Sequence, residues 1–471
     1  MQVVFEHRFL KVKWIGDFSP GGGAKCQSVE ESVGGTVVLS NGHKFQNPET
    51  IKTKLHHTIE QHGCFHNAIP SLMDSLMTGE WQKSLVKGIP SSSAAPVAPF
   101  KRVKWSDLAV RSDLGKRMLK RLQTCTPVHD CPDAYPQFNY DKHGQPRGKC
   151  GGVIQYELSG NGMGSDFHTW SEALCFAMVT NSSLTELPKW VWTDDALCQG
   201  AAPGSKYTYK DSSFGCYFGN QVDPTCDNSA APLRKKPLSY GVDARPMYGD
   251  CPLYSYNNAS QRFAWRVSAV EVLFAQMNPT LPYMASRLMH EMFGPQGAPD
   301  DLITIHIRHG DKAAESKLIR IDTFVDAAQG MVVRHKLQNP TIFILTDNIK
   351  AVHLFASAAP TEWTVVYDPT ICSKVYNEKW DGTGQAAQVV SQFRGSPGVA
   401  QLVSLIIALE AKYFLLTMDS NWSRLLEELR VGLGHCKNGV VDPDAKIDDW
   451  RTEHDNCRSH VEYIGGWSNG W

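Results

Sequence analysis

The chain of 471 residues lacks any long apolar run, and no stretch approaches the roughly 18 residues that a membrane-spanning helix needs. It also lacks an excess of charge, because its formal net charge is −1 and no run of five or more like charges occurs. This balance excludes a polybasic anchor and a nucleic-acid-binding tract. The segment 1–14 is too charged for a signal peptide. We therefore expect a roughly neutral globular protein without a nucleic-acid partner, attached to a membrane only through an anchor absent from this chain.

The thirteen cysteines include no C-x-x-C pair and no His/Cys spacing typical of a zinc site. Ten of them lie between Cys26 and Cys251, which predicts disulfides in a cysteine-rich N-terminal half, with buried or metal-bound thiols as the alternative. Disulfides indicate an oxidising, secretory-pathway compartment. Acceptor triplets for N-glycosylation at Asn181, Asn258 and Asn421 agree with that address, although Asn421 could serve a functional site instead.

The length and a hydrophobic content of 42% favour more than one domain. Many glycines, prolines and serines in the first 150 residues predict loops there, and a change of pattern at Asp301 predicts strands that alternate with helices. This rhythm is typical of an α/β fold with a doubly wound parallel sheet in its C-terminal part. The predicted strands are 302–307, 341–345, 364–367 and 413–416. The predicted helices are 106–123, 166–185, 265–276, 282–293, 321–335, 350–358, 399–411 and 421–431. The predicted divisions are a loop-rich region 1–150, lobes 151–295 and 296–440, and a tail 441–471.

Charged residues crowd the segment after the first strand of this sheet, in the run H-I-R-H-G-D-K from His306 to Lys312, with Glu315 close behind. So many charges at the end of a buried strand are costly unless a ligand or ion pairs compensate them, and a solvated loop with internal salt bridges is the alternative. Arg308 could hold a diphosphate through two N–H groups, and Lys312 could add positive charge. Glu315 could accept a proton from an incoming hydroxyl.

Polar residues also follow the second and fourth predicted strands. Asp347 and Asn348 could bind a ribose or the edge of a base, unless Asp347 simply caps the next helix. Ser420 and Asn421 stand where a helix is predicted to begin, and the unpaired N–H groups of such a helix attract anions such as a nucleotide phosphate.

A glycine-rich run, G-N-G-M-G-S-D-F-H from Gly160 to His168, opens the helix predicted over 166–185. Gly162 and Gly164 would let the backbone approach a ligand closely, although ordinary turns contain the same pattern. No strand is predicted before this run, and no acidic partner of a nicotinamide fingerprint follows it.

Together these four segments resemble the α1,6-fucosyltransferases, which include the rhizobial chitin-oligosaccharide enzymes and, more distantly, the protein O-fucosyltransferases. The run from His306 to Lys312 is similar to the family's H-V-R-R-x-D-K, and L-T-D-N before Ile349 is similar to A-T-D-D. The run T-M-D-S-N-W-S-R, from Thr417 to Arg424, is similar to T-F-S-S-x-x-x-R, and the glycine run is similar to G-x-G-x-x-x-x-H. The four motifs occur in the family's order between about residues 150 and 430.

The resemblance implies a GT-B arrangement, in which two Rossmann-like lobes face each other and the C-terminal lobe holds most of GDP-fucose. It implies inverting transfer to a glycan or glycoprotein without metal or cofactor, in the Golgi lumen, with Arg308 neutralising the β-phosphate of the leaving GDP. The catalytic residues implied are Arg308, Asp311, Lys312 and Glu315. The donor-binding residues implied are Gly162, Gly164, His168, His306, Arg308, Asp347, Asn348, Ser420 and Asn421.

The chain also departs from the family. His309 stands in place of the second arginine of the doublet, and Ser404 stands where a guanine-contacting aspartate is expected. Glu315 lies one place earlier than the family's acidic residue. We expect no SH3-like domain after the last motif, so the acceptor can differ from that of the core enzymes.

Three other functions remain open at the level of the sequence. A metal-dependent GT-A transferase would need a D-x-D motif, and Asp442-Pro-Asp444 fits the string but follows the last predicted helix. A protein O-fucosyltransferase or another GDP-sugar transferase would share the same donor motifs. A protein that only binds glycans or nucleotide sugars is the third, and the presence of Arg308, Asp311, Lys312 and Glu315 together argues against it.

Overall fold

A computed structural model of the chain describes residues 2–7, 12–17, 25–30, 37–38, 44–45, 96–122, 153–156, 162–179, 183–186, 190–199, 214–219, 233–236, 259–310, 312, 317–368, 390–391, 394–433 and 460–465. The chain divides into two compact units, Met1–Pro90 and Ser91–Trp471. Within the described ranges no helix is both long enough and apolar enough to span a bilayer.

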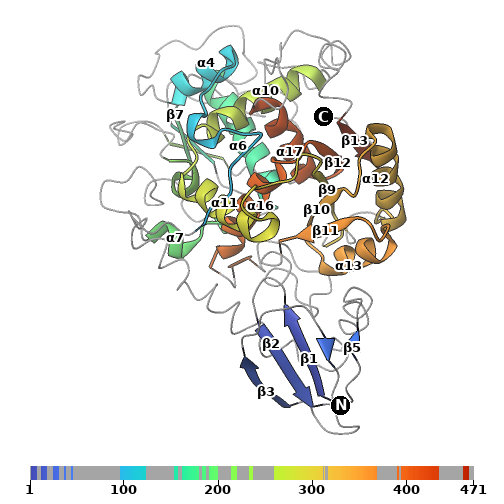
Figure 1. Ribbon diagram of the computed structural model, residues 1–471. Coiled ribbons are helices and arrows are strands. Elements are labelled where there is room, and N and C mark those ends of the chain that lie inside the picture. The colour runs from blue at the N-terminus through green and yellow to red at the C-terminus, as the bar shows by residue number, and fades with distance from the viewer. Residues whose placement is uncertain are drawn as a thin grey trace. The chain divides into compact units, whose positions relative to one another are not determined.

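The first unit contains antiparallel strands that the breaker-rich sequence does not predict. The strands are β1 (Gln2–His7), β2 (Val12–Asp17), β3 (Lys25–Glu30), β4 (Val37–Val38) and β5 (Lys44–Phe45). β1, β2 and β3 form one sheet in that order, and β4 pairs with β5. Neighbouring antiparallel strands need only short connections, which suits the short intervals between these segments (Figure 1).

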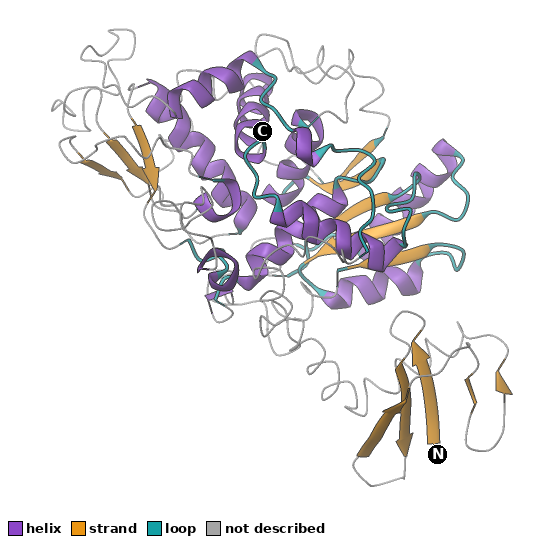
Figure 2. Cartoon of the chain, turned by 60° about the vertical axis from the view of Figure 1, so that its left-hand side comes forward, coloured by secondary structure: helices purple, strands orange, loops and turns teal. Residues whose placement is uncertain are grey.

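The second unit is built on a five-stranded parallel sheet (Figures 1 and 2). Its strands are β9 (Ile303–Ile307), β10 (Thr341–Thr346), β11 (Thr364–Tyr367), β12 (Tyr413–Thr417) and β13 (Val461–Ile464). The order in the sheet is β11-β10-β9-β12-β13, and each neighbouring pair is parallel. From β9 the strand order runs to one side through β10 and β11, and it then continues on the other side of β9 with β12 and β13. Doubly wound sheets bind their ligands at such a switch point, which here lies between β9 and β12. The doubly wound sheet predicted from the sequence is confirmed.

Two pairs of helices flank this sheet. They are α12 (Ile321–His335) and α13 (Ile349–Ala358), and α16 (Ser396–Ala408) and α17 (Asn421–Gly432). The three isoleucines of β9 pack in one buried cluster with residues of α12 and α13. Alternate residues of β9 face the other way: Thr304 donates a hydrogen bond to the carbonyl of Ala408 at the end of α16. His306, two residues further on, contacts Ser423 of α17.

A second parallel sheet and several helices precede β9. The strands are β6 (Val153–Tyr156), β7 (Ser183–Glu186) and β8 (Leu233–Lys236), in the order β7-β6-β8. The helices are η1 (Trp105–Asp107), α4 (Asp113–Leu122), α6 (Met163–Val179), α7 (Asp195–Gln199), α8 (Gly215–Phe218), α10 (Ala259–Phe274) and α11 (Thr280–Phe293).

The helix predicted over 166–185 starts and ends earlier than the sequence pattern indicates. It becomes α6, which stops at Val179, and Ser183–Glu186 form β7 instead. Asn181 and the two serines after it favour a break in a helix, because their side chains compete for backbone hydrogen bonds. β13 lies in the segment predicted as a tail, where three half-buried residues and one buried residue give too short a pattern to recognise.

The start of α16 lies directly against the backbone before α7. A Cβ atom at Gly395 would overlap the carbonyl oxygen of Thr193, and one at Gly398 would overlap that of Trp192. Gly395 also has a φ of +77°, a left-handed conformation that glycine adopts without strain. The two glycines therefore allow a backbone-to-backbone contact that no larger residue permits.

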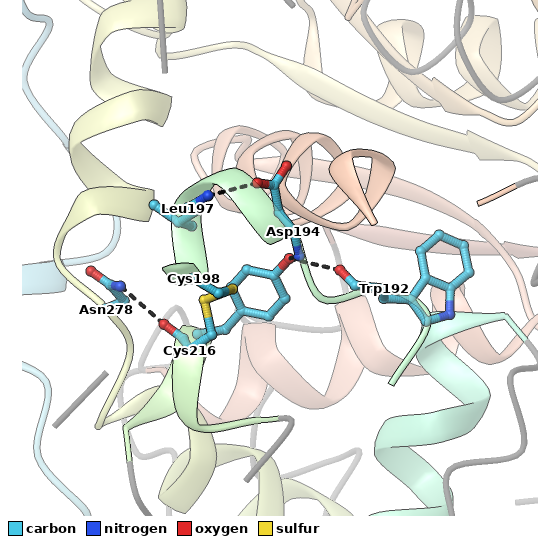
Figure 3. Close-up of a disulfide and its surroundings, with 7 residues drawn as sticks. Trp192, Asp194, Leu197, Cys198, Cys216 and Asn278 are labelled. Carbon is cyan, nitrogen blue, oxygen red and sulfur yellow. Dashed lines mark hydrogen bonds between the residues drawn. A yellow bond between two sulfur atoms is a disulfide. The ribbon is translucent and has the colours of Figure 1, made fainter. Parts of the chain in front are cut away.

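A disulfide holds the same region together (Figure 3). Cys198 of α7 is bonded to Cys216 of α8. The hydroxyl of Tyr217 donates to the carbonyl of Trp192 at 2.6 Å and accepts from the N–H of Asp194 at 2.7 Å. Cys175 is also disulfide-bonded. The predicted disulfides are confirmed for these cysteines, and most of the others lie outside the described residues.

We expect the double substitution Cys198→Ser and Cys216→Ser to lower the free energy of unfolding by about 3 kcal/mol, because the bond closes a loop with a sequence separation of 18. Denaturant unfolding without reductant measures this difference. Reductant should bring the two free energies of unfolding closer together, because it destabilises the wild-type protein more than the variant. Identical unfolding curves for the two unreduced proteins would contradict the structural role of this disulfide.

Candidate active site at the carboxyl edge of the sheet

The loop after β9 is folded around one carboxylate from the next strand. Asp347, which follows β10, accepts hydrogen bonds through Oδ1 from the N–H groups of His309 at 3.2 Å and Gly310 at 2.7 Å. Its Oδ2 forms an ion pair with the guanidinium of Arg308. A Cβ atom at position 310 would lie 2.5 Å from the carboxyl carbon of Asp347, so only glycine fits there. Asp347 thus fixes both the backbone and the cation of this loop.

His309 does not take the place of an arginine directed at a ligand. Its Nε2 donates to the carbonyl of Ile319 at 2.7 Å, and its ring packs edge-on against Phe324. Burial lowers the pKa of His309, an effect that the hydrogen bond to Ile319 opposes. The side chain therefore fastens the loop to the segment before α12.

His306 is a buried, neutral imidazole next to a cation. Its Nδ1 lies 2.6 Å from Ser423 Oγ, and its carbonyl accepts a hydrogen bond from Thr417 at 2.8 Å. Burial, with a smaller contribution from the charge of Arg308, lowers its pKa from 6.5 to about 3. At neutral pH the ring can therefore offer a hydrogen bond without adding charge to the site.

Two more cations contact the turn between β12 and α17. Lys312 Nζ lies 3.4 Å from the carbonyl oxygen of Asp419 and 4.0 Å from its carboxylate. Arg424 Nε donates to the carbonyl of Met418 at 2.9 Å. Ser420 is the N-cap residue of α17, but its side chain makes no capping hydrogen bond. Because the first N–H groups of a helix attract anions, this turn favours a negatively charged ligand.

The starts of α6 and α17 lie against each other. A Cβ atom at Gly164 would approach the backbone of Asn421 within 2.9 Å, so glycine is needed for this contact. His168 Nδ1 lies 3.1 Å from Asn421 Oδ1, and its Nε2 lies 3.0 Å from Glu428 Oε2. Burial is the largest influence on the pKa of His168 and lowers it, whereas Glu428 raises it. Both ring nitrogens are thus engaged by α17, and the helix whose N–H groups face the site is held in place by α6.

Most of the predicted site residues lie in the described parts of the chain. The sheet brings together Arg308, Lys312, His306, Ser420 and Asn421 at the carboxyl ends of β9 and β12, and Asp347 joins them from β10. Gly164 and His168 join them from α6. Asp311 and Glu315 lie outside the described residues.

Two predicted donor-binding residues have local structural roles in the chain. The side chain of Asn348 accepts a hydrogen bond from the N–H of Lys350 and caps α13. The carbonyl of Gly162 accepts from the N–H groups of Ser165 and Asp166 and so begins α6. The glycine run does follow a strand, β6, which corrects the expectation that none precedes it.

Asn421 is already engaged, which bears on its acceptor triplet for glycosylation. Its Oδ1 contacts His168, and Arg424 donates to the same oxygen at 3.5 Å. Asn421 is also the first residue of α17. The structure therefore favours a role of Asn421 in this site over a role as a glycan attachment point.

Some residues of the site region have no counterpart in the sequence prediction. Glu428 is fully buried behind His168, two helical turns after the start of α17, and no motif points to it. Asp368 directly follows β11 and pairs with Ser404. The rule that ligands bind beyond the carboxyl ends of strands would have identified Asp368. Within the described ranges, no group of three or more His, Cys, Asp or Glu side chains is placed to hold a metal ion.

No protein-family model and no curated protein matches the chain. Among solved structures, the chain is similar to NodZ alpha-1,6-fucosyltransferase soaked with GDP-fucose, with 13% identity, a TM-score of 0.32, and coverage of 59% of this chain and 92% of that chain. For the selenomethionine form of fucosyltransferase NodZ from Bradyrhizobium, identity is 12%, the TM-score is 0.33, and coverage is 59% and 91%. For a mutant of Arabidopsis thaliana FUT1 in complex with GDP, identity is 13%, the TM-score is 0.33, and coverage is 74% and 84%.

These structures are fucosyltransferases, which is the kind of enzyme that the sequence motifs resemble. At this identity and these TM-scores, the likeness carries no argument about the activity of this chain. The assignment depends on the chain's own residues.

We expect the stability of the wild-type protein to fall more steeply in acid than that of His306→Asn. Between pH 6.5 and pH 3 the unfolded chain protonates His306 and the folded chain does not, so stability is lost as the pH falls through this window. Between pH 7 and pH 5 the extra loss is about 2 kcal/mol. Denaturant unfolding of both proteins at the two pH values measures it. His168 and His309 titrate in both proteins, so equal pH dependences would contradict a neutral, buried His306.

Proposed function

We propose that the chain is a GT-B-like, inverting glycosyltransferase that transfers fucose from GDP-fucose to a hydroxyl of a glycan without a metal ion. The proposal depends mainly on the position of Arg308, which forms an ion pair with Asp347 at the carboxyl edge of the sheet. Helix α17 begins at the same edge. A cation fixed beside a helix start is suited to a diphosphate leaving group. The choice of fucose and of guanosine depends on the resemblance of the sequence motifs.

In the proposed reaction the acceptor oxygen forms a bond to the anomeric carbon as the bond from that carbon to the β-phosphate oxygen breaks. The bonding electrons leave with GDP, whose growing negative charge Arg308 and Lys312 stabilise together with the start of α17. Attack from the face opposite the leaving group inverts the configuration. The hydroxyl proton passes to a base, for which we propose Glu315, with Asp311 in the same loop.

We propose that Ser420, Asn421, Gly164 and His306 line the donor pocket. Because both nitrogens of the His168 ring contact α17, we assign it an indirect role, in which it holds Asn421 in place. We include Asn348 in the proposed pocket because it follows β10, and Gly162 because it lies at the start of α6.

We also propose that the protein works in the lumen of the secretory pathway. The bond between Cys198 and Cys216 supports an oxidising compartment, since such bonds are rare in the cytosol. A glycan or glycoprotein is the proposed acceptor.

We expect Arg308→Ala to lower transfer from GDP-fucose by a factor of roughly a thousand or more while the protein stays folded, because this contact strengthens as the diphosphate departs. Turnover and thermal unfolding are measured on the same preparation, with GDP-mannose and UDP-sugars as donor controls. Arg320→Ala is the matched variant, because Arg320 forms an exposed ion pair with Asp322. Full turnover in a folded Arg308→Ala protein would contradict the proposal, as would a clear preference for a UDP-sugar. Loss of transfer in EDTA would contradict metal independence.

If Glu315 is the base, Glu315→Gln should reduce turnover by roughly a hundredfold or more and leave GDP affinity unchanged, because the amide keeps the size of the carboxylate but cannot accept the proton. If Glu315 only pairs with a neighbouring lysine, turnover should change by no more than a few-fold. Steady-state turnover and GDP titration on one preparation separate the two outcomes. In the second case Asp311 would become the candidate base.

A further inference from the structure

A fully buried carboxyl group lies behind the proposed donor pocket. Glu428 is 0% exposed and lies on the same face of α17 as Asn421, because two helical turns separate the two residues. His168 of α6 lies between them, with its Nδ1 3.1 Å from Asn421 Oδ1 and its Nε2 3.0 Å from Glu428 Oε2. The three side chains form one row that begins between packed helices and ends at the start of α17.

The orientation of the Asn421 amide decides which hydrogen atoms this row contains. Arg424 donates from Nη1 to Asn421 Oδ1 at 3.5 Å, and a guanidinium group can only donate. The amide therefore turns its oxygen toward Arg424 and His168. Because an amide oxygen can only accept, the Nδ1 atom of His168 must carry a hydrogen.

The ring of His168 is neutral, which determines the role of its other nitrogen. Burial lowers the pKa of His168 below its ordinary value, the charges of Arg266 and Arg424 act in the same direction, and Glu428 opposes them. A neutral imidazole carries one hydrogen, so Nε2 is an acceptor when Nδ1 is the donor. An ionised carboxylate is also an acceptor. The contact at 3.0 Å is therefore a hydrogen bond only if the carboxyl group of Glu428 supplies a hydrogen.

The surroundings of Glu428 agree with a carboxyl group that keeps its hydrogen. In the described parts of the chain, Glu428 Oε1 is buried and makes no hydrogen bond, and the partner of Oε2 is His168. Burying an ionised carboxylate is very costly unless a cation or several donors compensate its charge. A carboxyl group that donates to Nε2 avoids most of this cost and satisfies the ring at the same time.

The other end of the row faces the proposed ligand. Since the oxygen of the Asn421 amide turns toward His168, the amino group of the same amide turns away from the ring. Asn421 is half-buried and is the first residue of α17, and the first N–H groups of a helix attract anions. In this orientation the amino group adds a donor beside those N–H groups, whereas the opposite orientation would place an acceptor there.

We infer that Glu428 is a positioning residue for the anionic ligand, because its hydrogen bond to His168 keeps the oxygen of Asn421 turned inward and the amino group turned toward the ligand. This inference rests on the proposed function. His168 transmits the constraint, since the donor on one side of its ring fixes the acceptor on the other side. Without a donor at position 428, Nδ1 no longer has to carry the hydrogen, and the amide is able to turn its oxygen toward the phosphate.

The experiment measures the affinity of the full-length protein for GDP by titration calorimetry, with two substitutions of Glu428. Glu428→Gln should bind GDP within about threefold of the wild-type affinity, because the amino group of glutamine donates to His168 as the carboxyl group does. Glu428→Leu has a similar volume but no donor, and it should bind GDP roughly tenfold more weakly. Equal weakening by the two substitutions would overturn the inference, as would full affinity in a folded Glu428→Leu protein.

A double-mutant cycle tests whether Glu428 acts through Asn421. Asn421→Ala removes the amino group, so adding Glu428→Leu to it should cause little further loss of GDP affinity. Independent losses that multiply would instead indicate a merely structural Glu428 and would overturn the inference. The matched control is Glu427→Gln, because Glu427 is equally buried but pairs with Arg430 and Tyr463. It should keep the wild-type affinity.

If Glu428→Leu does not fold, the position of the hydrogen on His168 is measured in the wild-type protein. Nitrogen NMR of histidine-labelled protein, with the His168 signals identified by their loss in His168→Gln, should show the hydrogen on Nδ1. A hydrogen on Nε2 would overturn the inference and leave the proposed function intact. A folded wild-type protein that does not bind GDP would overturn the proposed function, and the role of Glu428 toward the ligand with it.

Discussion

One carboxylate, that of Asp347, gives the candidate active site its shape. Asp347 satisfies two N–H groups of the loop after β9 while it holds the guanidinium of Arg308. Removing the carboxylate would leave a mostly buried cation and two donors without these partners, a kind of loss that is strongly destabilising in proteins. Arg308 is therefore positioned by the pairing of two strands, so formation of the sheet also forms the candidate site.

The contact between α6 and α17 fixes the other side of the site. β12 leads straight into α17, and α6 meets α17 through a close backbone contact at Gly164 and through His168. The first N–H groups of α17 are useful to a ligand only if the helix cannot shift along its axis. His168 engages α17 at Asn421 and again two turns later at Glu428, and contact at two levels resists such a shift.

The sequence predicts the central strands of the C-terminal sheet well because β9, β10 and β12 are buried on both faces and appear as short apolar runs. The helices between them are recognisable from their amphipathic periodicity. β13 is not predicted, because an edge strand of three half-buried residues and one buried residue has little hydrophobic signal. The division of the chain after Pro90 also depends on contacts that no local pattern records.

The positions of the site residues follow from strand ends, but their partners do not. The sequence identifies Arg308 and Asp347 as neighbours of a ligand, whereas the structure pairs them with each other. His309 looks like a conservative replacement for an arginine, yet a carbonyl ten residues later holds its ring. Such pairings depend on strand register and on helix packing. The spacing of residues along one sequence therefore does not predict them.

The two glycines at the start of α16 have a consequence for protein engineering. Gly395 and Gly398 allow the helix that leads into β12 to lie directly on the backbone of residues 192–194, which belong to the part of the chain before the large sheet. A fragment that contained only the large sheet and its helices would expose the start of α16 to water, because the backbone that covers Gly395 and Gly398 would be missing. Chimeras that exchange the two parts between homologous proteins would need to keep both glycines together with the chain segment that they contact.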